Sequence, residues 1–242
     1  MNKLNVALFF TLALAPAVSA FQSEGILPWV TNNPNFRSTV IVNNLNDVDV
    51  EVILVATRNN GDEEGVILEI PALSQVAADA GSLFPVLGDG PGYTVIAVYN
   101  DPNVSSAFII NSQSGASGNS PAQADVVSPD AAGENLLFNF LPVIPGSGAS
   151  APVVVNLGEE EAQIVFHAYQ GGTEIATSEP IALASGRPFA DITANLFPGV
   201  EGNIFVVAES TQPLVGMAFI FNEFGEPSMA NATAIAAVPG VQ

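Results

Sequence analysis

The sequence offers almost no thiol or imidazole side chains for nucleophilic or metal chemistry. The 242 residues include no cysteine and a single histidine, His167. A thiol nucleophile, a thiolate metal site and a disulfide framework are therefore excluded. No G-x-S-x-G, H-E-x-x-H, P-loop or dinucleotide motif occurs. We therefore interpret His167 as a surface histidine on the outward face of a strand, with no catalytic role.

Carboxylates are the abundant reactive groups, with 24 Asp and Glu against 4 Lys and Arg and a net charge of −20. Carboxylate pairs can hydrolyse glycosides, and clustered carboxylates can bind calcium. The densest clusters are Asp62–Glu64 and Glu159–Glu161, and neither has the spacing of an EF-hand loop. The sequence predicts a solvated acidic surface. We assign no catalytic, cofactor-binding or metal-ligating residue and no cofactor, with calcium binding as an alternative.

The elements that would position these groups repeat along the chain. Three motifs occur twice, as Val40–Asn43 and Val153–Asn156, Leu83–Pro85 and Leu196–Pro198, and Ala107–Asn111 and Ala218–Asn222. A nearly constant separation between copies indicates two homologous units of about 110 residues, close to the commonest domain size. The predicted domains are residues 21–131 and 132–242.

The pattern within each unit has the period of a β-strand. Asp47–Val52 alternates acids with valines, which places the acids on one face. Short strands separated by Gly, Pro, Asn and Asp are typical of an antiparallel sandwich. We expect one helical turn at each of 79–84 and 191–197, a loop at 112–121 and a linker at 129–135. The other expected strands are 38–43, 65–71, 93–99, 104–111, 123–128, 151–156, 175–183, 203–209, 214–222 and 232–238.

The repeat also predicts where the large aromatic side chains lie. Trp29 suggests stacking on a sugar, but it follows Leu27–Pro28, and Val143 follows Leu141–Pro142. An aliphatic counterpart favours a packing position over a sugar-binding platform. Phe108 and Phe219 occupy the same place in their motif. We therefore expect each to fill the core of its own unit.

Residues 1–20 have the pattern of a secretory signal peptide. Lys3 precedes the apolar run Val6–Ala13, and Val18–Ala20 provides small residues before a cleavage site. The mature chain would begin at Phe21, and no later segment is long and apolar enough to span a membrane. The sequence predicts a secreted or periplasmic protein, extracellular or associated with the cell surface. So few cations exclude nucleic acid and leave other proteins, the protein itself or surface glycans as partners.

The organisation resembles a loosely defined group of tandem immunoglobulin-like β-sandwich repeat proteins exported by bacteria. The shared features are an opening Leu-Pro, a Val-rich strand that ends in Asn, the Leu-Phe-Pro turn and a closing strand before proline, as in Val127–Pro129 and Val238–Pro239. The resemblance implies an all-β fold with two antiparallel, immunoglobulin-like sandwiches after the signal peptide. It implies no activity and no functional residue.

These observations favour a non-enzymatic protein with a structural or adhesive role at the cell surface or in the extracellular matrix. The alternative is an extracellular module that binds calcium or a glycan. A carboxylate-based hydrolase is the third hypothesis.

Overall fold

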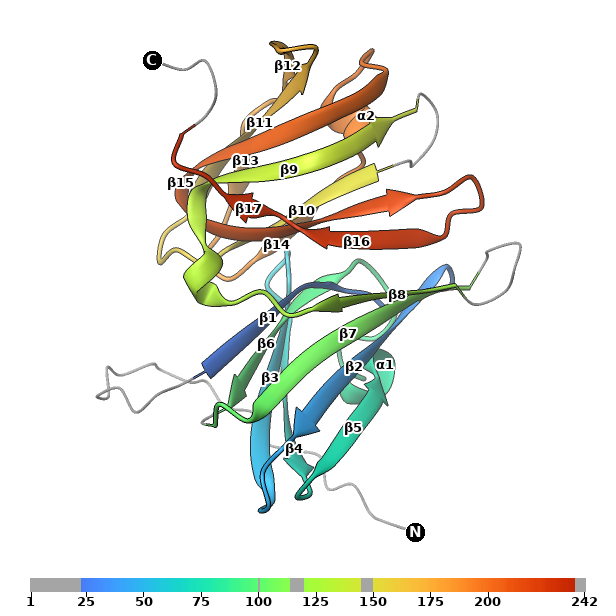
Figure 1. The fold of residues 1–242 in the computed structure, drawn as a ribbon, viewed down its shortest axis with the longest axis vertical. Helices are drawn as coiled ribbons and strands as arrows, with labels where there is room; N and C mark the ends of the chain where they lie inside the picture. Colours follow the sequence, from blue (N-terminus) through green and yellow to red (C-terminus); the bar gives the residue numbers. More distant parts are fainter. Residues whose placement is uncertain (1–22, 100, 114–119, 145–149, 238–242) are drawn as a thin grey trace.

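The computed structural model describes residues 23–99, 101–113, 120–144 and 150–237. The predicted signal peptide and most of the predicted loop at 112–121 lie outside the described residues. The regular elements of the described chain are almost all antiparallel strands, which confirms the predicted all-β sandwich fold (Figure 1). Among the described residues, no helix has the length and apolar character needed to cross a membrane.

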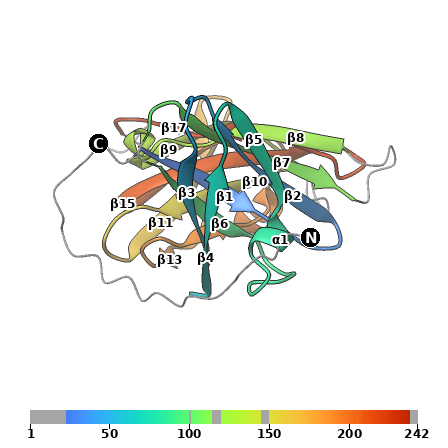
Figure 2. The same ribbon diagram turned by 90° about the horizontal axis from the view of Figure 1, so that it is seen from below.

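The N-terminal half, residues 23–131, has two four-stranded sheets with the orders β1-β6-β3-β4 and β5-β2-β7-β8. A short α1 (Ala80–Leu83) joins β5 to β6, and η1 (Pro129–Ala131) leads into the second half. Figure 2 looks from below, with the N-terminal half nearest the viewer. The strands are β1 (Ser23–Val30), β2 (Phe36–Asn44), β3 (Val50–Arg58), β4 (Glu63–Ile70), β5 (Ser74–Asp79), β6 (Tyr93–Tyr99), β7 (Val104–Ser112) and β8 (Ser120–Asp125).

The C-terminal half is organised around one long strand, β15, which pairs with β9 and β11 along its first part and with β10 and β16 along its second. Pro213 lies where the partners change, and the register with β9 shifts there. α2 (Thr193–Leu196) precedes β15. The strands are β9 (Gly133–Val143), β10 (Ser150–Asn156), β11 (Ala162–Gln170), β12 (Thr173–Thr177), β13 (Ile181–Leu183), β14 (Pro188–Ala190), β15 (Gly202–Phe221), β16 (Pro227–Asn231) and β17 (Thr233–Ala234).

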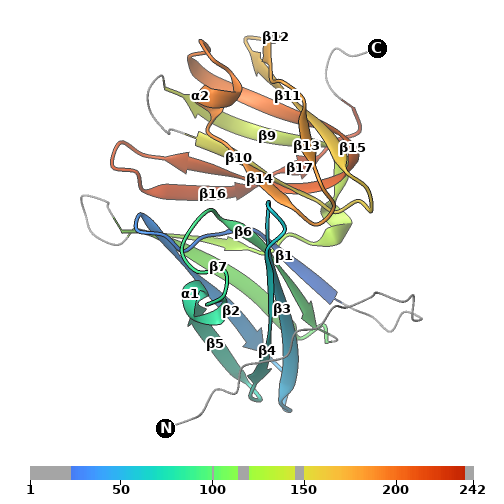
Figure 3. The same ribbon diagram turned by 180° about the vertical axis from the view of Figure 1, so that it is seen from behind.

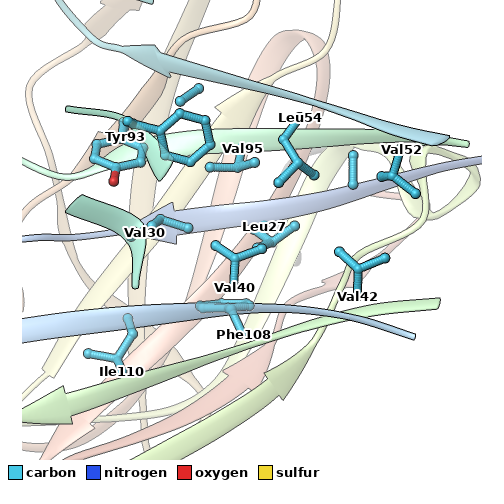
Figure 4. Close-up of a cluster of buried hydrophobic side chains, with 14 of the residues drawn as sticks. Leu27, Val30, Val40, Val42, Val52, Leu54, Tyr93, Val95, Phe108 and Ile110 are labelled. Atoms are coloured by element: carbon cyan, nitrogen blue, oxygen red, sulfur yellow. The ribbon is translucent and has the colours of Figure 1, made fainter. Parts of the chain in front are cut away.

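Alternating apolar residues form the core between the two sheets of the N-terminal half (Figure 4). Val52 and Leu54 on β3 face Val42 on β2 and Phe108 on β7, and all four side chains are fully buried. Side chains two residues apart on a strand share a face, so the period-two sequence pattern produces this apolar layer directly. The core position predicted for Phe108 is confirmed.

The same strand pairing occurs in both halves. In the first half β2 pairs with β5 and β7, and β7 pairs with β8; in the second half β10 pairs with β14 and β15, and β15 pairs with β16. The other layer also corresponds, because β6 lies between β1 and β3, and β15 lies between β9 and β11. This correspondence supports the hypothesis of two homologous units, and the boundary after residue 131 stays a prediction.

Two buried asparagines show which residues of the two halves correspond to each other. Asn44 Nδ2 donates to the carbonyls of Val48 (2.8 Å) and Ile70 (3.1 Å). Asn156 Nδ2 makes the corresponding bonds, to Glu160 (2.8 Å) and to the carbonyl of Leu183. Asn44 is therefore the counterpart of Asn156, and the motif match that paired Asn156 with Asn43 is wrong by one residue.

That one-residue difference changes the counterpart of Phe108. The two asparagines lie opposite Val104 and Leu214 in the neighbouring strands. Phe108 lies four residues beyond Val104, and Ala218 lies four residues beyond Leu214. Ala218 is therefore the counterpart of Phe108, and it packs in the apolar cluster of its own half.

The prediction that Phe219 fills the core of its own unit is consequently wrong. Phe219 is buried, but it packs with the cluster that contains the core of the N-terminal half. Its counterpart is Ile109, on the outer face of β7. A shift of one residue moves a strand side chain to the opposite face, so a small error in the motif match reversed its orientation.

Several predicted strand boundaries also differ from the structure. The segments 203–209 and 214–222 form the single strand β15, whereas 175–183 is divided into β12 and β13. The described part of 232–238 contains only the two-residue β17, β8 ends at Asp125, and β9 begins within the predicted linker. Strands β1, β5, β9 and β14 were not predicted. The helical turns are confirmed, and the Asp79 side chain accepts the Ser82 N–H at the start of α1.

Candidate functional site

The two halves meet through an apolar contact, because β10 is buried on both faces. Val154 points into the core of the C-terminal half, whereas Ala151 and Val153 pack with the core of the N-terminal half. Met217 on β15 lies opposite Val153 and joins the same cluster. Such double-sided burial explains why Ala151–Val155 contains no polar residue.

A second apolar cluster and two polar contacts extend the junction between the halves. Val155 and Val215 pack against Ile26 and Val127 of the N-terminal half. Asn59 Nδ2 donates to the carbonyl of Pro188 at 2.9 Å, and Arg187 donates to the carbonyl of Arg58 at 3.2 Å. Figure 3 shows β14 approaching the first half beside β3 and β4. The halves are therefore held by both apolar and polar contacts.

A cavity of about 310 Å³ lies at this junction, and four aromatic side chains are among the residues that line it. Trp29 and Phe36 come from the N-terminal half, and Phe219 and Phe221 come from the C-terminal half. The Phe36 and Phe221 ring centroids are 5.7 Å apart, and Phe221 stacks on Phe219 at 5.9 Å. Each half supplies part of the wall, so the cavity exists only when the halves are docked.

The polar groups that line the cavity are held by local hydrogen bonds. Asn33 Nδ2 donates to Thr31 Oγ1 at 2.9 Å, and Asn33 Oδ1 accepts the Phe36 N–H. Asp191 Oδ1 accepts the Ile192 N–H and the side-chain amide of Asn195, each at 2.8 Å. The cavity thus combines aromatic faces with positioned amide, hydroxyl and carboxylate groups. That combination suits a small cyclic ligand with both apolar and hydroxyl surfaces.

Trp29 is half-buried, so it both packs on the core and lines the cavity. A side chain on Gly92 would collide with the indole ring, so this glycine permits the close approach. The expectation of a packing position is confirmed in part. The sequence missed Phe36 and Phe221 as lining residues because their meeting depends on how the halves dock. The aromatic residues at 219 and 221, two apart on one strand face, were the available signal.

The counterpart of Trp29 is Phe140, and the predicted counterpart Val143 is wrong. Leu27 and Phe138 pair with equivalent positions in β6 and β15. Each strand then has a bulge and resumes pairing three residues later, at Val30 and Leu141. The residue before each of these positions is aromatic.

His167 lies on the predicted face of β11, but the prediction that it is a surface residue is wrong, since it is only 9% exposed. Its Nδ1 lies 3.0 Å from Glu174 Oε1 on β12. Its Nε2 lies 3.3 Å from Glu209 Oε2 on β15, in a direction unsuited to a hydrogen bond. The ring therefore links three neighbouring strands. Residues of the neighbouring strands cover the ring on this face. The local sequence does not show which residues these are.

The surroundings of His167 form a local polar network. Thr177 Oγ1 donates to Glu174 at 2.6 Å, and this bond, followed by the contact with His167, lowers the pKa of Glu174. Burial and then the negative charge of Glu174 raise the pKa of Tyr169. The two ring nitrogens face carboxylates on opposite sides, so these three groups cannot chelate one ion. The arrangement is suited to joining strands.

The two acidic clusters considered for calcium are not brought together. Glu64 accepts the N–H groups of Val86 and Leu87 at 2.9 and 3.1 Å, which anchors the segment after α1. In the second cluster, Glu161 accepts a bond from the side chain of Gln163. In the described ranges, no group of three or more His, Asp or Glu side chains is placed to hold a metal ion. Calcium binding stays a proposal.

Comparisons with known proteins give no family for this chain. Neither a protein family nor a curated protein matches the sequence. An alpha-L-rhamnosidase of Streptomyces avermitilis, solved with L-rhamnose, aligns with 90% of this chain at 11% identity and a TM-score of 0.23. This chain spans 28% of the length of that chain. The apo form of the Pleurotus ostreatus lectin aligns with 94% of this chain and 86% of its own, at 11% identity and a TM-score of 0.16. Both scores are too low to indicate a shared fold.

Proposed function

We propose that this protein is a secreted, non-enzymatic β-sandwich protein with a structural or adhesive role at the cell surface or in the extracellular matrix. The observation that supports this role most strongly is the apolar cluster shared by the two halves. Val153 and Met217 are fully buried in it, far from the connecting segment in sequence. Two sandwiches joined in this way transmit force as one body, whereas sandwiches on a flexible linker reorient independently.

The acidic surface is consistent with this role. The chain has a net charge of −20, so it repels itself and other acidic surfaces at low ionic strength. A protein of this kind remains soluble during export and becomes adhesive where salt or divalent cations screen its charge. Calcium acts here as a general counterion, without a defined cage.

Cell fractionation with a matched pair of variants tests the proposal. We expect the protein at the cell surface or in the medium, beginning at Phe21. Met217→Asp places a charge in the junction and should abolish surface retention or adhesion. Val86→Asp is the control, because Val86 is 77% exposed and outside the junction. A protein confined to the cytoplasm, or equal adhesion by both variants, contradicts the proposal.

The junction cavity favours a second function, binding of a glycan. Its four aromatic side chains offer stacking faces to a sugar ring, and Asn33 and Asp191 also line it and provide polar groups for hydroxyls. Its volume of about 310 Å³ is at the lower end of small-molecule sites, which suits one or two sugar residues. The ligand would contact both halves and hold them together.

A glycan array followed by calorimetry tests this second function. For any glycan that binds, Trp29→Ala should weaken the affinity about tenfold or more, which corresponds to loss of one stacking contact. Phe224→Ala is the control, because Phe224 is exposed and does not line the cavity. Binding that is equally sensitive to Phe224→Ala, or no binding to any glycan, contradicts a sugar site at the junction.

A further inference from the structure

The surface of the N-terminal half that receives the C-terminal half has an exposed counterpart on the C-terminal half itself. Trp29 and Ile110 of the first half line the junction against the second half. Their counterparts by strand register are Phe140 and Ile220. Phe140 is 48% exposed, and Ile144, which directly follows the end of β9, is 53% exposed. We call Phe140, Ile144 and Ile220 the receiving surface.

The face that docks within the chain also has a counterpart. Val153 and Met217 pair across β10 and β15 and pack on the N-terminal half. Their counterparts are Ile41 and Ala107, which pair across β2 and β7. Ile109 occupies the place of Phe219 beside them. We call Ile41, Ala107 and Ile109 the docking face. It lies on the outer side of the β5-β2-β7-β8 sheet, and Ile41 and Ile109 are partly exposed.

We propose that the protein binds a second copy of itself head to tail, with the docking face of one copy on the receiving surface of the next. This contact between copies repeats the contact between the two halves of one chain. Two different surfaces meet, so the interface is heterologous and leaves one free surface of each kind on every pair. Linear chains of copies follow. This inference rests on the proposed structural role and identifies a second copy of the protein as the partner.

The contact between copies is weaker than the contact within the chain. At the positions that Val155 and Val215 occupy in the second half, the first half has the polar residues Asn43 and Ser105. The contact between copies therefore buries less apolar surface. Each copy also carries a net charge of −20. Screening lengths fall from about 10 Å at 0.1 M salt to about 3 Å at 1 M. Assembly should therefore be reversible and should require high ionic strength.

Sedimentation velocity of the purified protein tests this proposal. The wild-type protein should be monomeric at about 0.05 M sodium chloride and should form species of increasing mass with concentration at about 1 M. Phe140→Glu removes the receiving surface, and Ile41→Glu removes the docking face. Each variant alone should remain monomeric at high salt. Val86→Glu is the control and should assemble like the wild-type protein.

Mixing the two variants gives the decisive result. Each retains the surface that the other lacks, so an equimolar mixture should form dimers and nothing larger. Ile144→Glu should replace Phe140→Glu with the same result, and circular dichroism confirms that each variant is folded. A wild-type monomer at every salt concentration, or a mixture that stays monomeric, overturns the proposal. A monomeric protein found at the cell surface would overturn self-association alone and leave the proposed role intact.

Discussion

At the residue scale, His167 shows what a sequence pattern can and cannot predict. The alternation of side chains along a strand predicted that His167 lies on the face opposite Phe166, and the structure agrees. The two carboxylates that contact its ring, Glu174 and Glu209, come from two other strands. A sequence pattern gives the face of a strand, whereas burial on that face depends on cross-strand neighbours.

Glu174 gives a pH-dependent prediction. Thr177 and His167 lower its pKa below the ordinary value of 4.5, so ionised Glu174 is favoured in the folded state. The stabilisation is complete above that ordinary value and is lost as the pH falls through the lowered pKa. Glu174→Gln should therefore reduce the loss of stability below pH 4.5. Urea unfolding between neutral and acidic pH measures this, with Glu179→Gln as the control; parallel pH profiles for Glu174→Gln and the wild-type protein would be inconsistent with it.

The aromatic contact across the junction gives a prediction about coupling. Phe36 and Phe221 lie in different halves, with ring centroids 5.7 Å apart. Phe36→Ala and Phe221→Ala should show a coupling energy of about 0.5–3 kcal/mol in a double-mutant cycle, because neighbours are not additive. Denaturant unfolding of the wild-type protein, both single variants and the double variant measures it. Strict additivity would show that the halves do not meet at this place.

At the element scale, strand positions were easier to predict than strand continuity. The predicted strand 93–99 coincides with β6, because alternation and flanking turn residues both mark it. Proline suggested a break between 209 and 214, yet β15 continues past Pro213. Pro213 lacks an N–H group but lies where the strand changes partners, so no ladder bond is lost. The next partner is a tertiary choice that the local sequence does not contain.

The two buried asparagines give the prediction at this scale. Asn44 donates to three carbonyls, of Val48, Ile70 and Pro71. Asn44→Ala leaves these buried or partly buried acceptors without a donor and should lower the free energy of unfolding by about 2–3 kcal/mol. Asn156→Ala should have a similar effect, whereas Asn43→Ala, one residue away, should have little. Chemical denaturation compares the three, and an equal loss for Asn43→Ala would restore the register of the original motif match.

At the scale of the whole molecule, the sequence predicted the all-β class, which the structure confirms, and the strand pairing common to both halves is consistent with the predicted repeat. Docking of the halves was not predictable. Val153 and Val154 look alike in the sequence, but one packs on the other half and the other fills its own core. The cavity with Trp29 and Phe221 follows from that docking. The aromatic residues were visible in the sequence, and their meeting was not.

A fragment of residues 132–242 has its own alternating strands, which by themselves predict independent folding. The shared cluster changes that expectation. Without the first half, Val153, Met217 and Phe219 would be exposed on one face of their sheet. A large exposed apolar face promotes association. The fragment should therefore aggregate or unfold at temperatures where the whole protein is stable, as light scattering and circular dichroism would show.

The central claim is that the two halves form one body through a continuous apolar junction, and differential scanning calorimetry tests it most directly. Cooperative unfolding of a single unit gives equal calorimetric and van't Hoff enthalpies. We expect one transition with that equality for the wild-type protein. Met217→Asp, which introduces a charge into the junction, should separate it into two transitions at lower temperature. Two independent transitions in the wild-type protein, unchanged by Met217→Asp, would contradict the account.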